Sequence, residues 1–202
     1  MKIVFEDQNV LVIFKPQGIE TNDAVPKGAY AVHRLDVNTE GLLILAKNQV
    51  AKRELESAFK DCLVDKTYLA LCFGVLRKSP LTLSGWLVKD SRSGHVKVTR
   101  EKSPGAVAVK TVVRFVKTVK DFSLFEIKPL TGRTHQIRAH LASIGIYIVG
   151  DGKYGDFKMN KVYDAKKQML CATALKFNFP TSSFLHYLNG KQFSVTPTFL
   201  AR

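Results

Sequence analysis

This 202-residue sequence predicts an α+β fold with a mostly antiparallel sheet. Runs of β-branched and aromatic residues recur along most of the chain, and several of them alternate with a period of two residues. Turn residues separate these runs at intervals of about ten residues. Only two segments have helical spacing, so strands outnumber helices in a single sheet-rich fold.

We expect strands wherever such runs are bounded by turn signals. The first run ends at Pro16 and Gly18, because proline lacks the N–H that would extend a strand ladder. The predicted strands are residues 9–16, 41–48, 67–76, 81–88, 95–99, 108–119 and 122–130.

Two segments are predicted to be helical. In residues 49–62, Asn48 is a suitable N-cap, and the apolar positions Ala51, Leu55, Phe59 and Cys62 recur at helical spacing. In residues 134–145, Thr134 is the predicted cap, and Gly145 is the expected stop. The buried stripe of this second helix would consist of Ile137, Leu141 and Ile144.

Composition indicates a globular protein. With 46% hydrophobic residues, the chain can bury a substantial core, so we expect one domain over residues 1–202, with two small lobes as the alternative. No transmembrane stretch and no leader are evident, so a soluble, unprocessed protein is expected. The odd number of cysteines, each in an apolar run, predicts reduced core thiols and a cytoplasmic location: Cys62, Cys72 and Cys171.

The charge balance points to a polyanionic partner. The chain carries 31 Lys and Arg against 17 Asp and Glu, a formal net charge of +14. Mixed charges would solubilise a protein equally well, so solubility does not require this excess. Because no basic amphipathic helix with an exposed apolar face is evident, nucleic acid is a better candidate than an anionic membrane.

Several familiar catalytic patterns are incomplete. Residues 150–155, GDGKYG, have dinucleotide-binding spacing, but no apolar helix or distal acid follows, so they predict a turn or loop. His135 and His140 are five residues apart and lack the Cys or Glu partners of a zinc site. A P-loop and a G-x-S-x-G motif are both missing. The sequence therefore predicts neither a metal nor an organic cofactor.

One cluster combines a base, a cation and a carboxylate: His33, Arg34 and Asp36, in a predicted loop between strands. Taken alone, Asp36 could be a turn-capping residue beside a solvated arginine. A second cluster changes this interpretation, because Arg133 precedes the predicted second helix, whose N-terminus carries partial positive charge. We expect Arg133 to pair with Asp36 and keep it ionised, which suits a nucleophile or a base.

Four segments, in order, resemble the motifs of the RluA family of RNA pseudouridine synthases. FKPQG at 14–18 resembles the K-P-x-G motif, and HRLDVNTEGLLILAKN at 33–48 resembles the H-R-L-D block. KTYLALCFG at 66–74 resembles the K-x-Y motif. PLTGRTHQIRAHLASIGIYIVGDGKYG at 129–155 resembles the long third motif. The similarity extends over about residues 8–180.

The resemblance implies an α+β catalytic domain with a mixed, mainly antiparallel sheet, flanking helices and a central RNA-binding cleft. It also implies isomerisation of uridine to pseudouridine in ribosomal or transfer RNA, without a metal or organic cofactor. It identifies Asp36 as the catalytic aspartate, Arg133 as its partner and Tyr68 as the tyrosine that stacks on the base. Arg34 would help to displace the target nucleotide. Three further motif residues are expected at the RNA: His33, Lys15 and Arg138.

The sequence departs from the family pattern at two positions: Glu40 replaces the usual Ser, and Asn38 replaces a residue that is often acidic. Too few residues precede Asp36 for the small S4 RNA-binding domain of many members, so we expect the catalytic domain, as a monomer, to capture substrate alone. The alternative function is a non-catalytic RNA-binding protein or RNA chaperone on the same scaffold. A hydrolase of free uridine would have no use for the basic charge.

Overall fold

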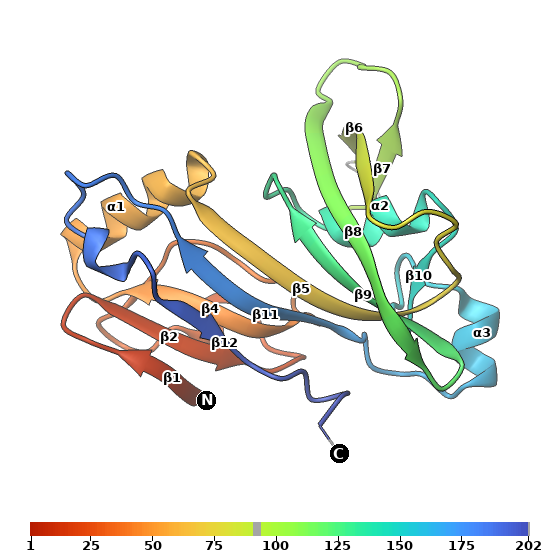
Figure 1. The fold of residues 1–202 in the computed structure, drawn as a ribbon, viewed down its shortest axis with the longest axis horizontal. Coiled ribbons are helices and arrows are strands. Elements are labelled where there is room, and N and C mark those ends of the chain that lie inside the picture. Colours follow the sequence, from red (N-terminus) through yellow and green to blue (C-terminus); the bar gives the residue numbers. More distant parts are fainter. Residues whose placement is uncertain (91–93, 202) are drawn as a thin grey trace. The chain divides into compact units, whose positions relative to one another are not determined.

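The computed structural model describes residues 1–90 and 94–201. The chain forms two compact units: Met1–Thr67 with Cys171–Arg202, and Tyr68–Leu170. It passes between the units within two strands, β5 (Val64–Phe73) and β11 (Leu170–Phe177) (Figure 1). The single domain over residues 1–202 stays a prediction.

The first unit is built on the strand order β1-β2-β4-β11. Strand β3 pairs with β4, and β12 pairs with β11. The β4–β11 pairing is parallel, whereas β1–β2, β2–β4, β3–β4 and β11–β12 are antiparallel. Besides β11, the strands are β1 (Lys2–Glu6), β2 (Val10–Lys15), β3 (Tyr30–Ala31), β4 (Glu40–Ala46) and β12 (Gln192–Ser194).

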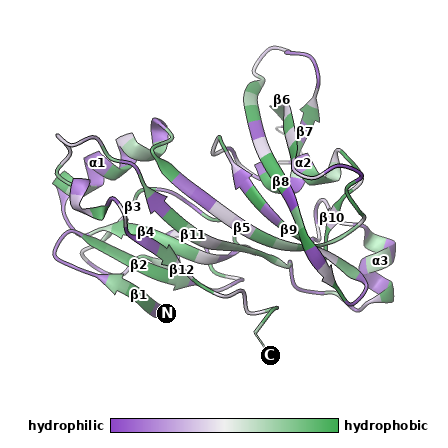
Figure 2. Cartoon of the chain, in the orientation of Figure 1, coloured by the Kyte–Doolittle hydropathy of each residue, from purple (hydrophilic) through white to green (hydrophobic). Residues whose placement is uncertain are grey.

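Strands β2 and β4 are hydrophobic along their length because both of their faces are covered (Figure 2). On one face, Leu42 and Ile44 belong to a core that includes the apolar side of α1 (Gln49–Lys60). On the other face, Leu43 and Leu45 pack with residues of the segment 19–31, which contains the 3-10 helix η1 (Asn22–Ala24). Burial on two sides therefore explains the continuous apolar run of β4.

Helix α1 begins as predicted, because the Asn48 side chain accepts a hydrogen bond from the backbone N–H of Ala51 at 2.9 Å. Its buried residues are Ala51, Leu55 and Ala58. The predicted burial of Cys62 is wrong: the helix ends at Lys60, and Cys62 is exposed with a positive φ of 58°. Cys72 and Cys171 are buried, as predicted.

The second unit has the strand order β5-β9-β8-β6-β7, with β10 paired to β5. Each of these pairings is antiparallel. The predicted strands 81–88, 95–99, 108–119 and 122–130 are confirmed, and with the first unit they confirm the α+β class. The elements are β6 (Leu81–Lys89), β7 (Val96–Thr99), β8 (Val107–Val119), β9 (Phe122–Pro129) and β10 (Tyr147–Ile148).

Helix α2 (Gln136–Ala142) packs on this sheet through Ile137 and Leu141. The predicted cap Thr134 is wrong, because His135 occupies the N-cap with a φ of 53° and no side-chain cap bond. The predicted burial of Ile144 is also wrong, since the helix ends at Ala142 and Ile144 is 38% exposed.

The predictions did not include several elements. Among these are β1, β11, β12 and the short pieces β3 and β10. The others are α3 (Phe157–Val162) and the two 3-10 helices, η1 and η2 (His186–Leu188). Residues 150–155 form a turn, as predicted. Within the described part of the chain, no helix has the length and apolar character needed to cross a membrane.

Candidate active site

Asp36 lies in the loop that joins β3 to β4, as predicted. The backbone N–H of Thr39 donates to the carbonyl of Asp36 at 2.9 Å and closes a tight turn. Asp36 is partly buried, whereas Arg34 is exposed. The loop thus combines a carboxylate in a defined turn with a solvent-facing cation.

Both chain neighbours of Asp36 are anchored. The Thr21 hydroxyl donates to the carbonyl of Leu35 at 3.0 Å and accepts from the N–H of Leu35 at 3.1 Å. On the other side, the backbone N–H of Gly18 donates to the carbonyl of Val37 at 2.9 Å. Since hydrogen bonds immobilise both flanking residues, Asp36 is presented from a preorganised backbone. Thr21 was not predicted, because no local pattern connects it with a residue fourteen positions later.

Lys15 is the central residue of this anchor. It is fully buried, and its Nζ donates to the carbonyls of Pro16, Ile19 and Val37 at 2.9, 2.8 and 3.1 Å. Burial lowers the pKa of Lys15 to about 8, against the opposing charges of Asp36 and Glu40. In this conformation the three N–H donors of Lys15 bind backbone carbonyls, and its RNA contact stays a prediction.

The His33 side chain binds the backbone of β4. Its Nε2 accepts from the backbone N–H of Ile44 at 3.1 Å, and its ring stacks on Phe59 with the centroids 4.3 Å apart. Ile44 lies between the residues of β4 that pair with β3 and those that pair with β11. Burial, with the charge of Lys66, lowers the pKa of His33 to about 3. The imidazole is therefore neutral at pH 7, and the RNA contact of His33 stays a prediction.

Acid should destabilise the protein through His33. In the unfolded chain this histidine takes up a proton below its usual pKa of 6.5, but in the folded chain it does so only near pH 3. Because the unfolded state binds more protons between these values, the free energy of unfolding falls as pH falls from 6.5 to 3. By pH 4 the loss from this group is on the order of 3 kcal/mol.

Denaturant melts of the parent and of His33→Gln at pH 7 and pH 4 measure this effect. The variant starts less stable, because the N–H of Ile44 loses its ring acceptor, but it should lose less stability on acidification than the parent. Equal acid losses in the two proteins would contradict the role of His33.

In the second unit, Arg133 is exposed in the loop before α2. Its backbone N–H donates to Oε1 of Gln136 at 3.1 Å, and the Thr131 hydroxyl donates to the same oxygen at 2.7 Å. Nε2 of Gln136 donates to the carbonyl of Lys110 and to the hydroxyl of Thr111, both at 3.0 Å. Gln136 thus fixes the backbone that carries Arg133. Gln136 was not predicted as a site residue, because its partners Lys110 and Thr111 lie 26 and 25 positions away in the sequence.

Arg138 makes a buried bidentate ion pair. Its Nε and one terminal nitrogen donate to the two carboxylate oxygens of Asp151 at 2.7 and 2.9 Å. Only 7% of Arg138 and 1% of Asp151 is exposed. Burial raises the pKa of Asp151, but the hydrogen bonds from Arg138 and from the backbone of Tyr154 and Lys153 outweigh it and lower the pKa. Arg138 is therefore held inside the fold by Asp151, and its RNA contact stays a prediction.

Tyr68 lies on β5 opposite Ile127 of β9. It is partly buried and packs against the core of the second unit. Asp36 belongs to the first unit, whereas Tyr68 and Arg133 belong to the second. The catalytic roles of these three residues and the pairing of Asp36 with Arg133 stay predictions.

Comparison with known proteins decides the family. The family model described as RNA pseudouridylate synthase matches residues 17–143, which contain Asp36, Tyr68 and Arg133. The chain belongs to this family. Most of the Asp36 anchor, including Gly18 and Thr21, falls within the matched region.

Several proteins are similar to this chain over most of its length. A ribosomal large subunit pseudouridine synthase C of Rickettsia bellii is 37% identical over 186 residues, which are 78% of this chain and 58% of the relative. An uncharacterized RNA pseudouridine synthase of Helicobacter pylori is 36% identical over 173 residues, 84% of this chain and 68% of the relative. The chain thus spans little more than half of the Rickettsia protein.

The fold has a solved counterpart. The structure of human RNA pseudouridylate synthase domain containing 1 superposes with a TM-score of 0.82 at 26% identity. The similarity covers 98% of this chain and 84% of the human one. This agreement supports the α+β class on independent grounds.

Glu40, which departs from the pseudouridine synthase motif, has a structural role. It is 2% exposed, and its carboxylate accepts from the backbone N–H and the hydroxyl of Thr198 at 2.8 and 2.6 Å. Glu40 therefore connects the segment around Thr198 to the start of β4. The next residue, Gly41, has a φ of +123°, and a side chain there would collide with the backbone of Ala172 on β11. Asn38, the other departure, is exposed in the Asp36 loop.

Residues 1–90 and 94–201 contain no group of three or more His, Cys, Asp or Glu side chains that could hold a metal ion. The two candidate histidines have separate partners. His135 Nδ1 lies 3.0 Å from the Tyr154 hydroxyl, and His140 Nδ1 lies 2.9 Å from the Thr111 hydroxyl.

Proposed function

We propose that this chain isomerises specific uridines in structured RNA to pseudouridine. The observation that carries the proposal is the anchored loop, in which hydrogen bonds fix Leu35 and Val37 on either side of Asp36. Membership of the pseudouridylate synthase family supplies the reaction class. Relatives named for the large ribosomal subunit support ribosomal RNA as the first substrate to test, with transfer RNA as the second.

The proposed reaction needs one ionised carboxylate. The bond between ribose C1′ and uracil N1 breaks, the base turns, and C5 joins C1′, while the C5 proton is lost and N1 gains one. Glycosidases usually need a second carboxyl group to protonate an alkoxide leaving group. Uracil leaves as a delocalised anion, so Asp36 can suffice, either by adding to C1′ or by removing the C2′ proton.

The other proposed roles concern the base and its displacement. The glycosidic bond of a uridine within a base stack is inaccessible, so the nucleotide must be flipped out. Flipping costs on the order of a few kcal/mol, because the base is unstacked. We assign the vacated space to Arg34, which is exposed beside the Asp36 loop. Tyr68 stacks on the detached uracil, and Arg133 supplies positive charge. Lys15 and His33 support the fold of the loop through their hydrogen bonds to Val37 and Ile44.

The alternative, an RNA-binding protein without catalysis, would use the basic surface but would not need an anchored Asp36. The deciding experiment incubates ribosomal and transfer RNA with the parent protein and maps pseudouridine at single-nucleotide resolution. Enzymatic activity predicts new pseudouridine at defined positions in at least one RNA. RNA that binds tightly but gains no pseudouridine would support the alternative.

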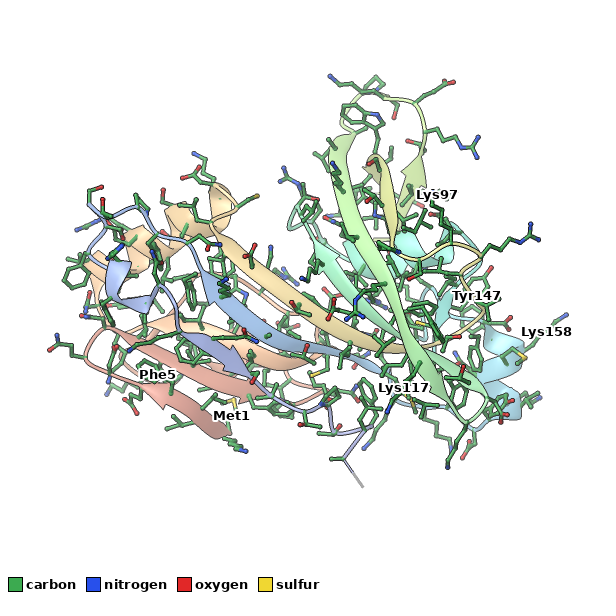
Figure 3. All side chains as sticks on the ribbon, in the orientation of Figure 1. Met1, Phe5, Lys97, Lys117, Tyr147 and Lys158 are labelled. Atoms are coloured by element: carbon green, nitrogen blue, oxygen red, sulfur yellow. The ribbon has the colours of Figure 1, made fainter. Side chains whose placement is uncertain are left out.

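RNA affinity should fall steeply with salt. The chain has a formal charge of +14, and lysines such as Lys97, Lys117 and Lys158 are exposed (Figure 3). Each phosphate that is neutralised releases counterions, so log affinity should fall linearly with log salt, with a slope of about −0.7 to −0.9 per contact. The slope can be measured by filter binding or fluorescence anisotropy at KCl concentrations from about 50 to 300 mM. A flat profile would contradict electrostatic capture.

A further inference from the structure

Lys66, in the first unit, is a cation that the predicted site does not use. It lies on β5, and its Nζ is 5.9 Å from the centroid of the Phe59 ring. The Phe59 ring also stacks on His33, the residue before the exposed Arg34. Because Phe59 contacts both side chains, Lys66 lies near His33 and the segment that carries Arg34 and Asp36.

The surroundings of this ammonium are unusual for a lysine. Burial lowers the pKa of Lys66, with a smaller opposing effect from Cys62, and its charge in turn lowers the pKa of His33. Within residues 1–90 and 94–201, no carboxylate forms an ion pair with Nζ and no acceptor hydrogen-bonds to it. Besides these electrostatic effects, the ammonium of Lys66 makes a cation–π contact with Phe59.

Such an arrangement destabilises the free protein. A partly buried cation loses hydration, and without an acceptor it gains little in return. Natural sequences keep locally unfavourable groups of this kind mainly where a ligand compensates for them. The compensating ligand here must be an anion that approaches Lys66 from solvent.

We propose that Lys66 binds a backbone phosphate of the RNA, close to the nucleotide that Arg34 displaces. This inference rests on the proposed function and extends its RNA-binding site to Lys66, the first residue of the K-x-Y motif, which has no role in the predicted site. Lysine suits this task because its ammonium is a compact charge with three donors that can meet phosphate oxygens from several directions. The strongly basic chain makes a polyanion the expected source of that phosphate.

Salt dependence of RNA affinity tests the contact. We would compare Lys66→Gln with Lys60→Gln, a variant of equal net charge at an exposed lysine of α1. Losing one phosphate contact should make the slope of log affinity against log salt shallower by about 0.7 to 0.9 in Lys66→Gln. Lys66→Arg should keep most of the parental slope. Equal changes in the two Gln variants would overturn the proposal, because only net charge would then matter.

Thermal stability separates a ligand site from a structural role. Because the ammonium is unsatisfied in the free protein, Lys66→Gln should leave the Tm unchanged or raise it, while RNA binding weakens. A lower Tm or failure to fold would mean that Lys66 supports the structure, and the proposal would be wrong.

These measurements are independent of catalysis when they are made in an Asp36→Asn background. A reduced slope in Lys66→Gln would support the phosphate contact even if the parent protein forms no pseudouridine, which would count against the proposed function alone. Conversely, pseudouridine formation by the parent with an unchanged slope in Lys66→Gln would overturn only the role of Lys66.

Discussion

Replacing Asp36 with Asn is expected to abolish pseudouridine formation while leaving the fold and RNA binding intact. The amide keeps the size of the side chain and its ability to accept hydrogen bonds. It removes the charge, and a neutral amide can neither add to C1′ nor take the C2′ proton. We expect turnover to fall at least about 10³-fold, the scale seen when a group that acts on the reacting atoms is deleted.

Single-turnover release of tritium from RNA labelled at uracil C5, measured beside RNA affinity, checks this prediction. The anchors of the loop use the backbone of Leu35 and Val37, so the variant should keep the parental Tm. A rate near that of the parent would refute the mechanism. Parallel losses of rate and affinity would instead make Asp36 a structural residue.

Replacing Arg138 with Ala should have the largest effect on stability. The change leaves the carboxylate of Asp151, which is 1% exposed, without its bidentate partner. Breaking a buried ion pair in this way costs about 3–5 kcal/mol. For a unit of this size, that corresponds to a fall in Tm of at least roughly 10 °C. Differential scanning calorimetry measures it.

Arg133→Ala is the matched control for Arg138→Ala. Both changes remove one arginine from the same segment, but Arg133 is exposed and contacts Gln136 only through its backbone N–H. Its replacement should leave the Tm within about 1 °C, as for most surface substitutions, and should lower turnover if Arg133 acts in catalysis. An Arg138→Ala protein with parental Tm and weakened RNA binding would contradict this structural role and support the predicted RNA contact of Arg138.

Local patterns predicted many of the strands and one helix boundary, because those features depend on neighbouring residues. Asn48 is recognisable as a cap from its type and from the helical run that follows it. The second helix was predicted less well. Its start depends on His135 in a left-handed conformation and on Gln136 binding the strand residue Lys110, which is distant in sequence.

The sequence by itself determined the family, the loop position of Asp36 and the candidate residues around it, because four ordered motifs carry that information. Only the tertiary structure decided which basic motif residues face solvent. In the sequence, Lys15 and Arg138 are candidate RNA-binding cations. In the structure both are buried, because Lys15 binds carbonyls such as that of Val37 and Arg138 binds the carboxylate of Asp151. A charge is visible in a sequence, but its partner depends on segments that meet only when the chain folds.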